Sequence, residues 1–452
     1  MNMRKFAFSL LSLVFLFSCS DYSLSDSNLT VNEIEFAPKM QEFYNRIDME
    51  EAMAQAQAAI GFLDREHPSE SGSRMVSSVS VLRFGAVKAA VLESGEYRDI
   101  GFSDTLAYVF NFNDSLGFAI VSIDKRVDSP LFAFTKWGHL VNGKTDNPGL
   151  MIFLERLEGY VLESIIEAER HGEAMPDGIL GKLLVEPGKI EEQKQAAQTR
   201  ADTIILPIPI KYVFPLVPVE WGQGGPFNLR LDSSDPICNK YKTGCVATAT
   251  VQIMSYWQYP TNINGNSYAW ATLNEFKNKN DFTIYSTDNI ATIAKKTSAR
   301  VQVSSLFEQV SSINLYYGCD ASGAQSADGL HFLLTKGFKL PWNTYFKPYD
   351  IEIVNSFLAP TYRRPLMANG RTIINNNSVG HAWVIDGLMA FNTFKIIDDT
   401  VISNKISYHI HNNWGWDGLD NGYYLSGVFN PLHPSQNIQL NFQNVEIGSV
   451  YR

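Results

Sequence analysis

Net charge divides this 452-residue chain into two parts. Residues 1–200 contain 19 Lys and Arg against 29 Asp and Glu, whereas residues 201–452 contain 18 of each kind, so the whole net charge of −10 belongs to the first part. At roughly 100–200 residues per domain, the length allows two or three domains, and a change of composition favours a boundary near residue 200. The acidic balance argues against a nucleic-acid-binding protein, which usually has a basic patch.

The beginning of the chain has the layout of a secretory signal. Arg4 and Lys5 precede an apolar run, Phe6–Phe17, that is too short for the roughly 20 residues of a membrane span. The run ends in Leu-Phe-Ser before Cys19, which resembles a bacterial lipobox. We expect the segment 1–18 to be a signal peptide and Cys19 to be lipidated, so that the protein is exported to the cell surface or outer membrane. An ordinary signal peptide with an incidental cysteine is the alternative.

The remainder of the acidic part has the pattern of a small α+β unit. Apolar side chains recur at helical spacing over residues 40–62 and 150–171. Three short runs between them have β character, and a turn-forming Asn-Asp-Ser separates the first two (106–112, 117–123 and 131–135). This unit has no evident catalytic constellation. The polar stretch 189–203 lacks apolar periodicity and is typical of an exposed linker.

In the neutral part, Cys245 has a setting suited to a nucleophile. Gly244 precedes it, and apolar residues then recur at helical spacing up to Trp257, shortly before Pro260. Cys245 is therefore expected to open a buried helix, whose N-terminus favours thiolate over thiol. The alternative is a structural cysteine on a core helix. Cys238 and Cys319 could pair as a disulfide in an exported protein, which would leave Cys245 free.

A thiolate nucleophile needs a base, and His381 is the best-placed candidate. It follows a glycine and precedes an apolar run, so its ring would project from the start of a strand. The other histidines of this part are expected to be structural, although His409 and His411 should share one face of a strand. No third ligand is suitably spaced beside that pair, so we expect no metal site.

Two further groups complete the pattern of an acyl-transfer enzyme. Downstream of His381, the sequence Asn-Asn-Trp-Gly-Trp offers Asn413 to orient an imidazole and Trp414 to shield it from water. Gln223, upstream of Cys245, could bind an oxyanion together with the backbone N–H of Cys245. The order Gln, Cys, His, Asn is the layout of papain-like thiol proteases.

Several segments resemble the streptopain family of bacterial cysteine peptidases. They are TGCVATAT (243–250), VGHAWVIDG (379–387), NWGWDG (413–418) and, in the acidic part, residues 110–134. The resemblance implies a secreted zymogen of α+β class that needs no cofactor. An inhibitory pro-domain over residues 19–200 would precede a papain-like catalytic domain of two subdomains, one helical and one antiparallel β, over residues 201–452.

Residue by residue, the resemblance implies that Cys245 is the nucleophile, His381 the general base and later acid, and Gln223 the oxyanion donor. Either Asn413 or Trp414 would support the imidazole. Gly380 and the loop that contains Ser322 and Gly323 would contact the substrate backbone. Protein or peptide substrates and the chain's own pro-domain are the implied partners, with a membrane reached only through the lipid anchor.

The chain departs from the family at Cys319 and Asp417, where small residues are usual, which leaves substrate preference open. Two other functions stay open as well. A transglutaminase-like enzyme would use an acidic residue that follows the histidine in the chain, such as Asp398. A non-catalytic surface lipoprotein or protease inhibitor would act through the acidic part alone.

Overall fold

A single antiparallel sheet of eleven strands organises the part of the chain that the structure describes. The computed structural model describes residues 46–66, 74–85, 88–89, 93, 102–174, 208–338, 346–374, 377–397, 400–429 and 443–449. Cys19, the linker 189–203, Asp398 and His433 lie outside these residues. The strands follow in the order β1-β2-β3-β4-β12-β11-β10-β9-β13-β8, with β5 paired to β10.

The N-terminal unit, meaning the described residues between 46 and 174, contributes one end of this sheet. Its strands are β1 (Val76–Arg83), β2 (Thr105–Phe112), β3 (Phe118–Ser122) and β4 (Leu131–Thr135), and its helices are α2 (Met49–Glu66) and α4 (Pro148–Ala174). The three expected strands, the expected 150–171 helix and the turn at Asn113–Ser115 are confirmed. Residues 40–45 of the first expected helix lie outside the described residues. Its described part begins at Met49, because Arg46 and Ile47 are extended against Ile123 and Asp124, after β3.

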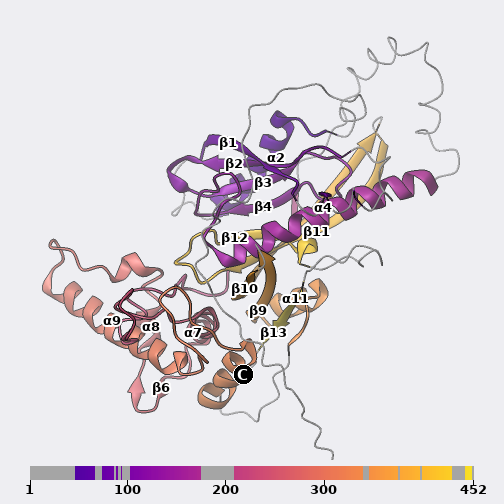
Figure 1. The fold of residues 1–452 in the computed structure, drawn as a ribbon. Helices are drawn as coiled ribbons and strands as arrows, with labels where there is room; N and C mark the ends of the chain where they lie inside the picture. The colour runs from indigo at the N-terminus through magenta and orange to yellow at the C-terminus, as the bar shows by residue number, and fades with distance from the viewer. Residues whose placement is uncertain are drawn as a thin grey trace, which may run out of the picture.

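The catalytic sheet, meaning the strands after residue 200, continues this end without a break. It contains β5 (Ile208–Val213), β8 (Lys347–Pro348), β9 (Leu366–Ile374), β10 (Asn377–Ile397), β11 (Thr400–Asn413), β12 (Gly422–Leu425) and β13 (Gln443–Gly448). Strand β4 pairs with β12, from Thr135 opposite Gly422 to Ala133 opposite Tyr424. Figure 1 shows α4 running along the same side of both halves. The charge boundary near residue 200 is thus not a boundary of the sheet.

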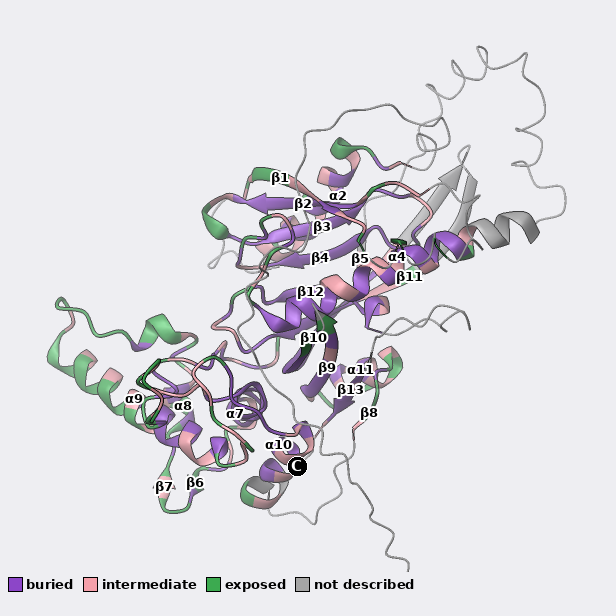
Figure 2. Cartoon of the chain, in the orientation of Figure 1, coloured by how far each residue is buried: buried purple, intermediate pink, exposed green. Residues whose placement is uncertain are grey.

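The helical part, residues 221–338, forms a separate lobe beside the catalytic sheet (Figure 1). It contains α7 (Cys245–Trp257), α8 (Trp270–Leu273), α9 (Ile290–Ser311), α10 (Ser326–Phe332), short turns at Lys279–Phe282 and Leu333–Phe338, and the small hairpin of β6 (Asn262–Ile263) and β7 (Asn266–Ser267). Helix α11 (Ile351–Leu358) and the turn Ser426–Val428 pack elsewhere, against the catalytic sheet. Figure 2 shows α7 buried between β10 and α9, of which mainly the first half is exposed.

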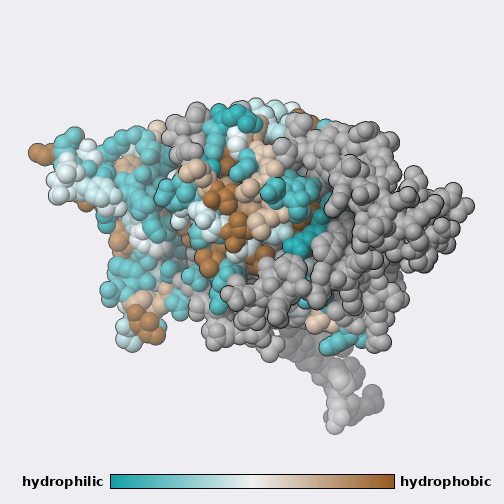
Figure 3. All heavy atoms as spheres, turned by 90° about the horizontal axis from the view of Figure 1, so that it is seen from above, coloured by the Kyte–Doolittle hydropathy of each residue, from teal (hydrophilic) through white to brown (hydrophobic). Residues whose placement is uncertain are grey.

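The α+β fold with a helical and an antiparallel β part is therefore confirmed. From above, the described surface is mainly hydrophilic, with a group of hydrophobic side chains toward its middle (Figure 3). Within the described residues, none of the helices combines the length and apolar character needed to cross a membrane.

Candidate active site

Cys245 occupies the first position of α7, as the sequence predicts. Gly244 before it has φ 89°, a left-handed conformation that glycine adopts without strain, and a Cβ there would lie 2.8 Å from the Ser322 carbonyl oxygen. Cys245 is buried in a small cluster with Ala382, the residue after His381, and with Ala321 and Ala324. These contacts bring the helix N-terminus, the histidine strand and the loop of Ser322 together.

The cysteines of the described residues are all oxidised. Cys238 and Cys319 form a disulfide with a Cα–Cα distance of 5.6 Å, which realises the pairing that the sequence left open. Cys245 is also disulfide-bonded, so the expectation that it stays free beside that bridge was wrong for this form of the chain. Cys245 can act as a nucleophile only after this disulfide is reduced.

His381 lies near the start of β10 and is fully buried. Its Nε2 is 2.8 Å from the main-chain oxygen of Trp414. A carbonyl oxygen only accepts, so Nε2 carries the proton and Nδ1 is the basic ring atom. Burial lowers the pKa of His381 to about 4, against the opposing effect of the Trp414 hydrogen bond, so the ring is neutral at neutral pH. The ring of Trp383 stacks on it at 6.2 Å, and Trp416 meets it edge-on.

Gln223 holds a buried amide that lacks an acceptor. Its side chain is 5% exposed, and its Nε2 has no hydrogen-bond partner among the described residues. The Thr243 N–H donates to the Gln223 carbonyl at 3.2 Å. Since Thr243 is two residues before Cys245, this bond holds Gln223 near the start of α7. A buried donor without an acceptor destabilises the folded chain. Near Cys245, such a donor could bind an oxyanion that forms only during the reaction.

The structure distinguishes the two candidates for supporting the imidazole. Trp414 accepts from His381 through its carbonyl oxygen, while its indole N–H donates to the Asp420 carbonyl. The Asn413 side chain turns elsewhere: its Nδ2 donates to the Val219 carbonyl at 2.8 Å, and its Oδ1 accepts from Gln252 at 3.0 Å. Trp414 is therefore the described partner of the imidazole, through its main chain.

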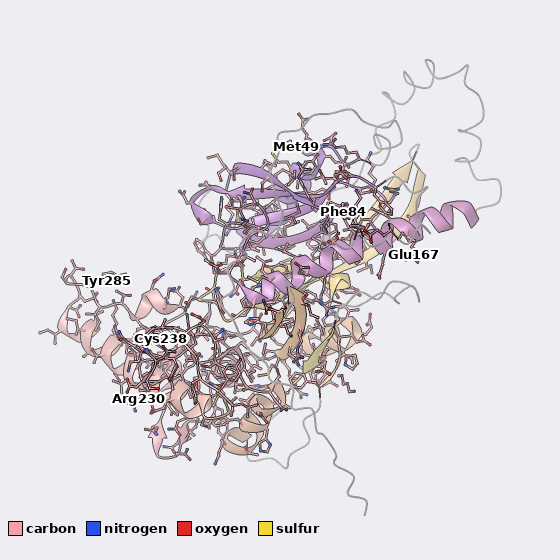
Figure 4. The ribbon with its side chains drawn as sticks, viewed as in Figure 1. Met49, Phe84, Glu167, Arg230, Cys238 and Tyr285 are labelled. Carbon is pink, nitrogen blue, oxygen red and sulfur yellow. A yellow bond between two sulfur atoms is a disulfide. The ribbon has the colours of Figure 1, made fainter. Side chains whose placement is uncertain are left out.

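The expected substrate contacts lie beside these groups. Ser322 and Gly323 are buried, and the Ser322 hydroxyl accepts from the Gly318 N–H at 3.1 Å. Gly380 is buried next to His381 on β10. The Cys238–Cys319 disulfide joins this loop to the segment that leads into Cys245, on the helical side of the molecule where Figure 4 labels Cys238.

Two other histidines have buried partners that the sequence did not predict. His409 is buried, with its Nε2 2.8 Å from the Leu131 carbonyl oxygen of β4. His411 contacts the buried Asp386 carboxylate at 2.6 Å, and the other oxygen of Asp386 accepts from the Val217 N–H. Among the described residues, no three His, Cys, Asp or Glu side chains gather in a group that could hold a metal ion. The VIDG motif marks Asp386 in the sequence, but only the structure shows that His411 is its partner.

The site and the comparisons together define a class. Residues 221–424, which contain Gln223, Cys245, His381 and Trp414, match the model of the Peptidase C10 family. The chain is a cysteine-type peptidase. It is also streptopain-like: it is 24% identical to streptopain of Streptococcus pyogenes over 95% of this chain and 94% of that protein. These findings favour a peptidase over the transglutaminase-like and non-catalytic alternatives.

Three further proteins are similar to this chain. The thiol protease/hemagglutinin PrtT of Porphyromonas gingivalis is 26% identical over 83% of this chain and 38% of its own length. Among solved structures, a mutant prointerpain A fragment of Prevotella intermedia matches 83% of this chain and 99% of its own, with a TM-score of 0.46 and 20% identity. Active interpain A covers 52% of this chain with a TM-score of 0.35 and 22% identity.

Proposed function

We propose that the chain is the precursor of an exported cysteine endopeptidase that works through a Cys245 thioester. The observation that carries the proposal is the buried, unpaired Nε2 of Gln223 beside the helix that Cys245 opens. The signal-like N-terminus and Cys19 support export and a lipid anchor, and cleavage of the linker would release the mature protease from that anchor.

In this mechanism the thiol proton of Cys245 moves to Nδ1 of His381, and the sulfur attacks the carbonyl carbon of the scissile peptide bond. Gln223 and the Cys245 N–H donate to the resulting oxyanion. His381 then gives the proton to the leaving amine, and a thioester remains on Cys245. His381 next takes a proton from water, the hydroxide attacks the thioester, and the acid product and the thiol are released. The Trp414 carbonyl keeps the imidazole oriented throughout.

The N-terminal unit acts as the inhibitory pro-domain in this proposal. Support comes from its contact with the partner of the catalytic histidine: a Cβ on Gly149 of α4 would lie 2.1 Å from the Trp414 ring. The Asn147 amide also donates to Asp420, in the loop after Trp414. A shift of α4 therefore acts on the segment that orients His381.

Maturation would separate the two parts by cleavage of the linker. The sequence favours cleavage within about 189–215, and the pairing of residues 208–213 with β10 as β5 supports a narrower range. A paired strand is a poor protease substrate, since its backbone groups are engaged. Cleavage before Ile208 would leave β5 in the mature enzyme.

The test is the pair Cys245→Ala and Cys238→Ala, each made in the full chain and assayed on casein under reducing conditions after processing. Cys245→Ala should fold and have no activity, whereas Cys238→Ala should retain activity. Iodoacetamide should label Cys245 faster than the other two thiols in the reduced, processed protein. Substantial casein cleavage by Cys245→Ala would overturn the proposed nucleophile.

A further inference from the structure

Gln252 is a fully buried polar side chain on the catalytic helix that the proposed mechanism does not use. It lies seven residues after Cys245 on α7, which is close to two helical turns, so both side chains leave the same side of the helix. The residues around it in α7 are mostly apolar, and a glutamine at such a position needs partners to offset its desolvation.

Its amide has two acceptors, each on a different catalytic segment. Nε2 donates to the Trp221 carbonyl oxygen at 2.8 Å and to Asn413 Oδ1 at 3.0 Å. Trp221 is two residues before Gln223, and Asn413 directly precedes Trp414. One amide therefore connects the helix of the nucleophile, the segment of the oxyanion donor and the segment that orients the imidazole.

The segment that orients the imidazole is held further by Asn413 and Asn421, both nearly fully buried. Asn413 Oδ1 also accepts from the Asn421 amide at 3.2 Å, and Asn421 Oδ1 accepts from the Trp414 N–H at 2.9 Å. Trp414 is thus fixed through its N–H by Asn421, while its carbonyl accepts a hydrogen bond from His381 Nε2. Asn413 in turn donates to the Val219 carbonyl, on the Gln223 segment.

We propose that Gln252 is a positioning residue for the peptidase reaction. It holds the Trp414 carbonyl and the Gln223 amide in their positions relative to Cys245. The inference rests on the proposed function. Loss of the two donated hydrogen bonds leaves the Trp221 and Asn413 oxygens buried without this donor, so both segments shift to find others. A shift of about 1 Å in a catalytic geometry lowers turnover by about 10²-fold.

The experiment compares Gln252→Met with Thr250→Val in the processed, reduced protein. Methionine keeps the approximate volume of glutamine and removes both donors. Thr250 is a matched control, because it is equally buried on α7 and its hydroxyl bonds within the helix, to the Val246 carbonyl at 2.7 Å. Gln252→Met should lose about 10²-fold in kcat with KM nearly unchanged, and Thr250→Val should keep its kcat.

The pH dependence of Cys245 alkylation separates positioning from mere folding. A displaced His381 accepts the thiol proton of Cys245 less readily, so iodoacetamide should label Gln252→Met more slowly than wild type at mildly acidic pH and equally fast at alkaline pH. Gln252→Glu should recover activity as the pH falls, because a protonated carboxyl regains one donor. Unchanged kcat and unchanged labelling in a folded Gln252→Met would overturn the inference.

The two proposals fail in different ways. If the processed wild-type chain has no peptidase activity, the proposed function fails, and the alkylation profile still tests Gln252. If wild type is active and Gln252→Met loses activity only in proportion to its unfolded fraction, with a wild-type labelling profile, the positioning role fails alone.

Discussion

The helical part and the N-terminal unit attach to the catalytic sheet in different ways. The helical part has an aromatic core, in which Trp221, Phe227, Phe282 and Phe307 pack on one another. Where the structure describes them, the strands of the catalytic sheet contribute only Met367 and Val384 to its buried residues. The N-terminal unit has no separate core among the described residues: its buried side chains belong to two clusters that also contain residues of the catalytic sheet. The part that carries Cys245 is thus built as a lobe, and the part proposed to leave is built as a continuation of the sheet.

This difference bears on activation. Removal of the N-terminal unit uncovers the edge of β12 and the aromatic residues beneath it, including Tyr423 and Tyr424. Those contacts do not depend on the covalent linker. A chain cut before Ile208 should therefore keep its N-terminal piece bound until some further event releases it. The contacts are mainly apolar and hydrogen-bonded, so salt should affect them little.

The largest expected effect on turnover lies on the helical side of the comparison. Gln223→Ala should reduce turnover on a peptide by about 10²–10³-fold, because it removes one oxyanion donor. The rate of Cys245 alkylation should stay at its wild-type value, since Gln223 takes no part in the proton transfer from Cys245 to His381. Kinetics and labelling on one reduced, processed preparation check both. Equal losses in turnover and labelling would show that Gln223 instead supports the structure of the site.

A second prediction concerns the N-terminal side. The Phe134 ring on β4 lies 5.3 Å from Tyr423 and 6.1 Å from Phe391, both in the catalytic sheet. Phe134→Ala should weaken docking by about 3–5 kcal/mol, the usual cost of truncating a buried Phe. In a chain cut within the linker, size-exclusion chromatography should then find the N-terminal piece dissociated, and the peptidase active.

Phe132→Ala is the matched control for this experiment. Phe132 is buried on the same strand, but its ring contact is with Tyr160 of α4, inside the N-terminal unit. It should destabilise the unit with less release of the piece from the catalytic part. If both variants release the piece equally, docking does not depend on the ring cluster around Phe134.

Local patterns predicted the helix that begins at Cys245 better than they predicted the assembly of the sheet. The start of α7 at Cys245 follows from a glycine, a helical apolar period and a nearby proline, all close together in the chain. The β4–β12 pairing joins segments from the two parts of different charge, far apart in the sequence, and no local pattern specifies which edge a strand will meet. Gln252 was missed for the same reason: it is one polar residue in an apolar helix, and its acceptors come from two distant segments.

The Cys238–Cys319 disulfide offers a third, intermediate effect, confined to the helical side. It closes a loop with a sequence separation of 81. Replacing both cysteines by serine should lower the stability of the helical part by about 2–4 kcal/mol. It should also raise KM, because Cys319 adjoins the loop of Ser322, and leave kcat near wild type. Thermal unfolding and kinetics check this, with reduced wild type as the control. A fall in kcat with an unchanged KM would contradict it.

The smallest expected effect is the pH dependence of docking, where two buried groups oppose each other. Burial lowers the pKa of His409 to about 4 in the docked chain, although its bond to the Leu131 carbonyl acts in the other direction. Released His409 would return toward 6.5, so the released form binds the extra proton. Its contribution to docking is full above pH 6.5 and declines as the pH falls toward 4. Asp420 behaves oppositely: burial raises its pKa to about 6 against the amide of Asn147, so docking gains as the pH falls from 6 toward 3.8.

Wild-type docking should therefore change little between pH 6 and pH 4, since the two contributions cancel, and single substitutions should expose each one. His409→Gln keeps an N–H donor for Leu131 but cannot titrate, so its docking should tighten on acidification through Asp420 alone. Asp420→Asn should loosen on acidification through His409 alone, by about tenfold per pH unit at most. Dissociation constants of the cut chain, measured across this range, check the pair. Parallel pH profiles for the two variants would show that neither group reports the docking of the N-terminal unit.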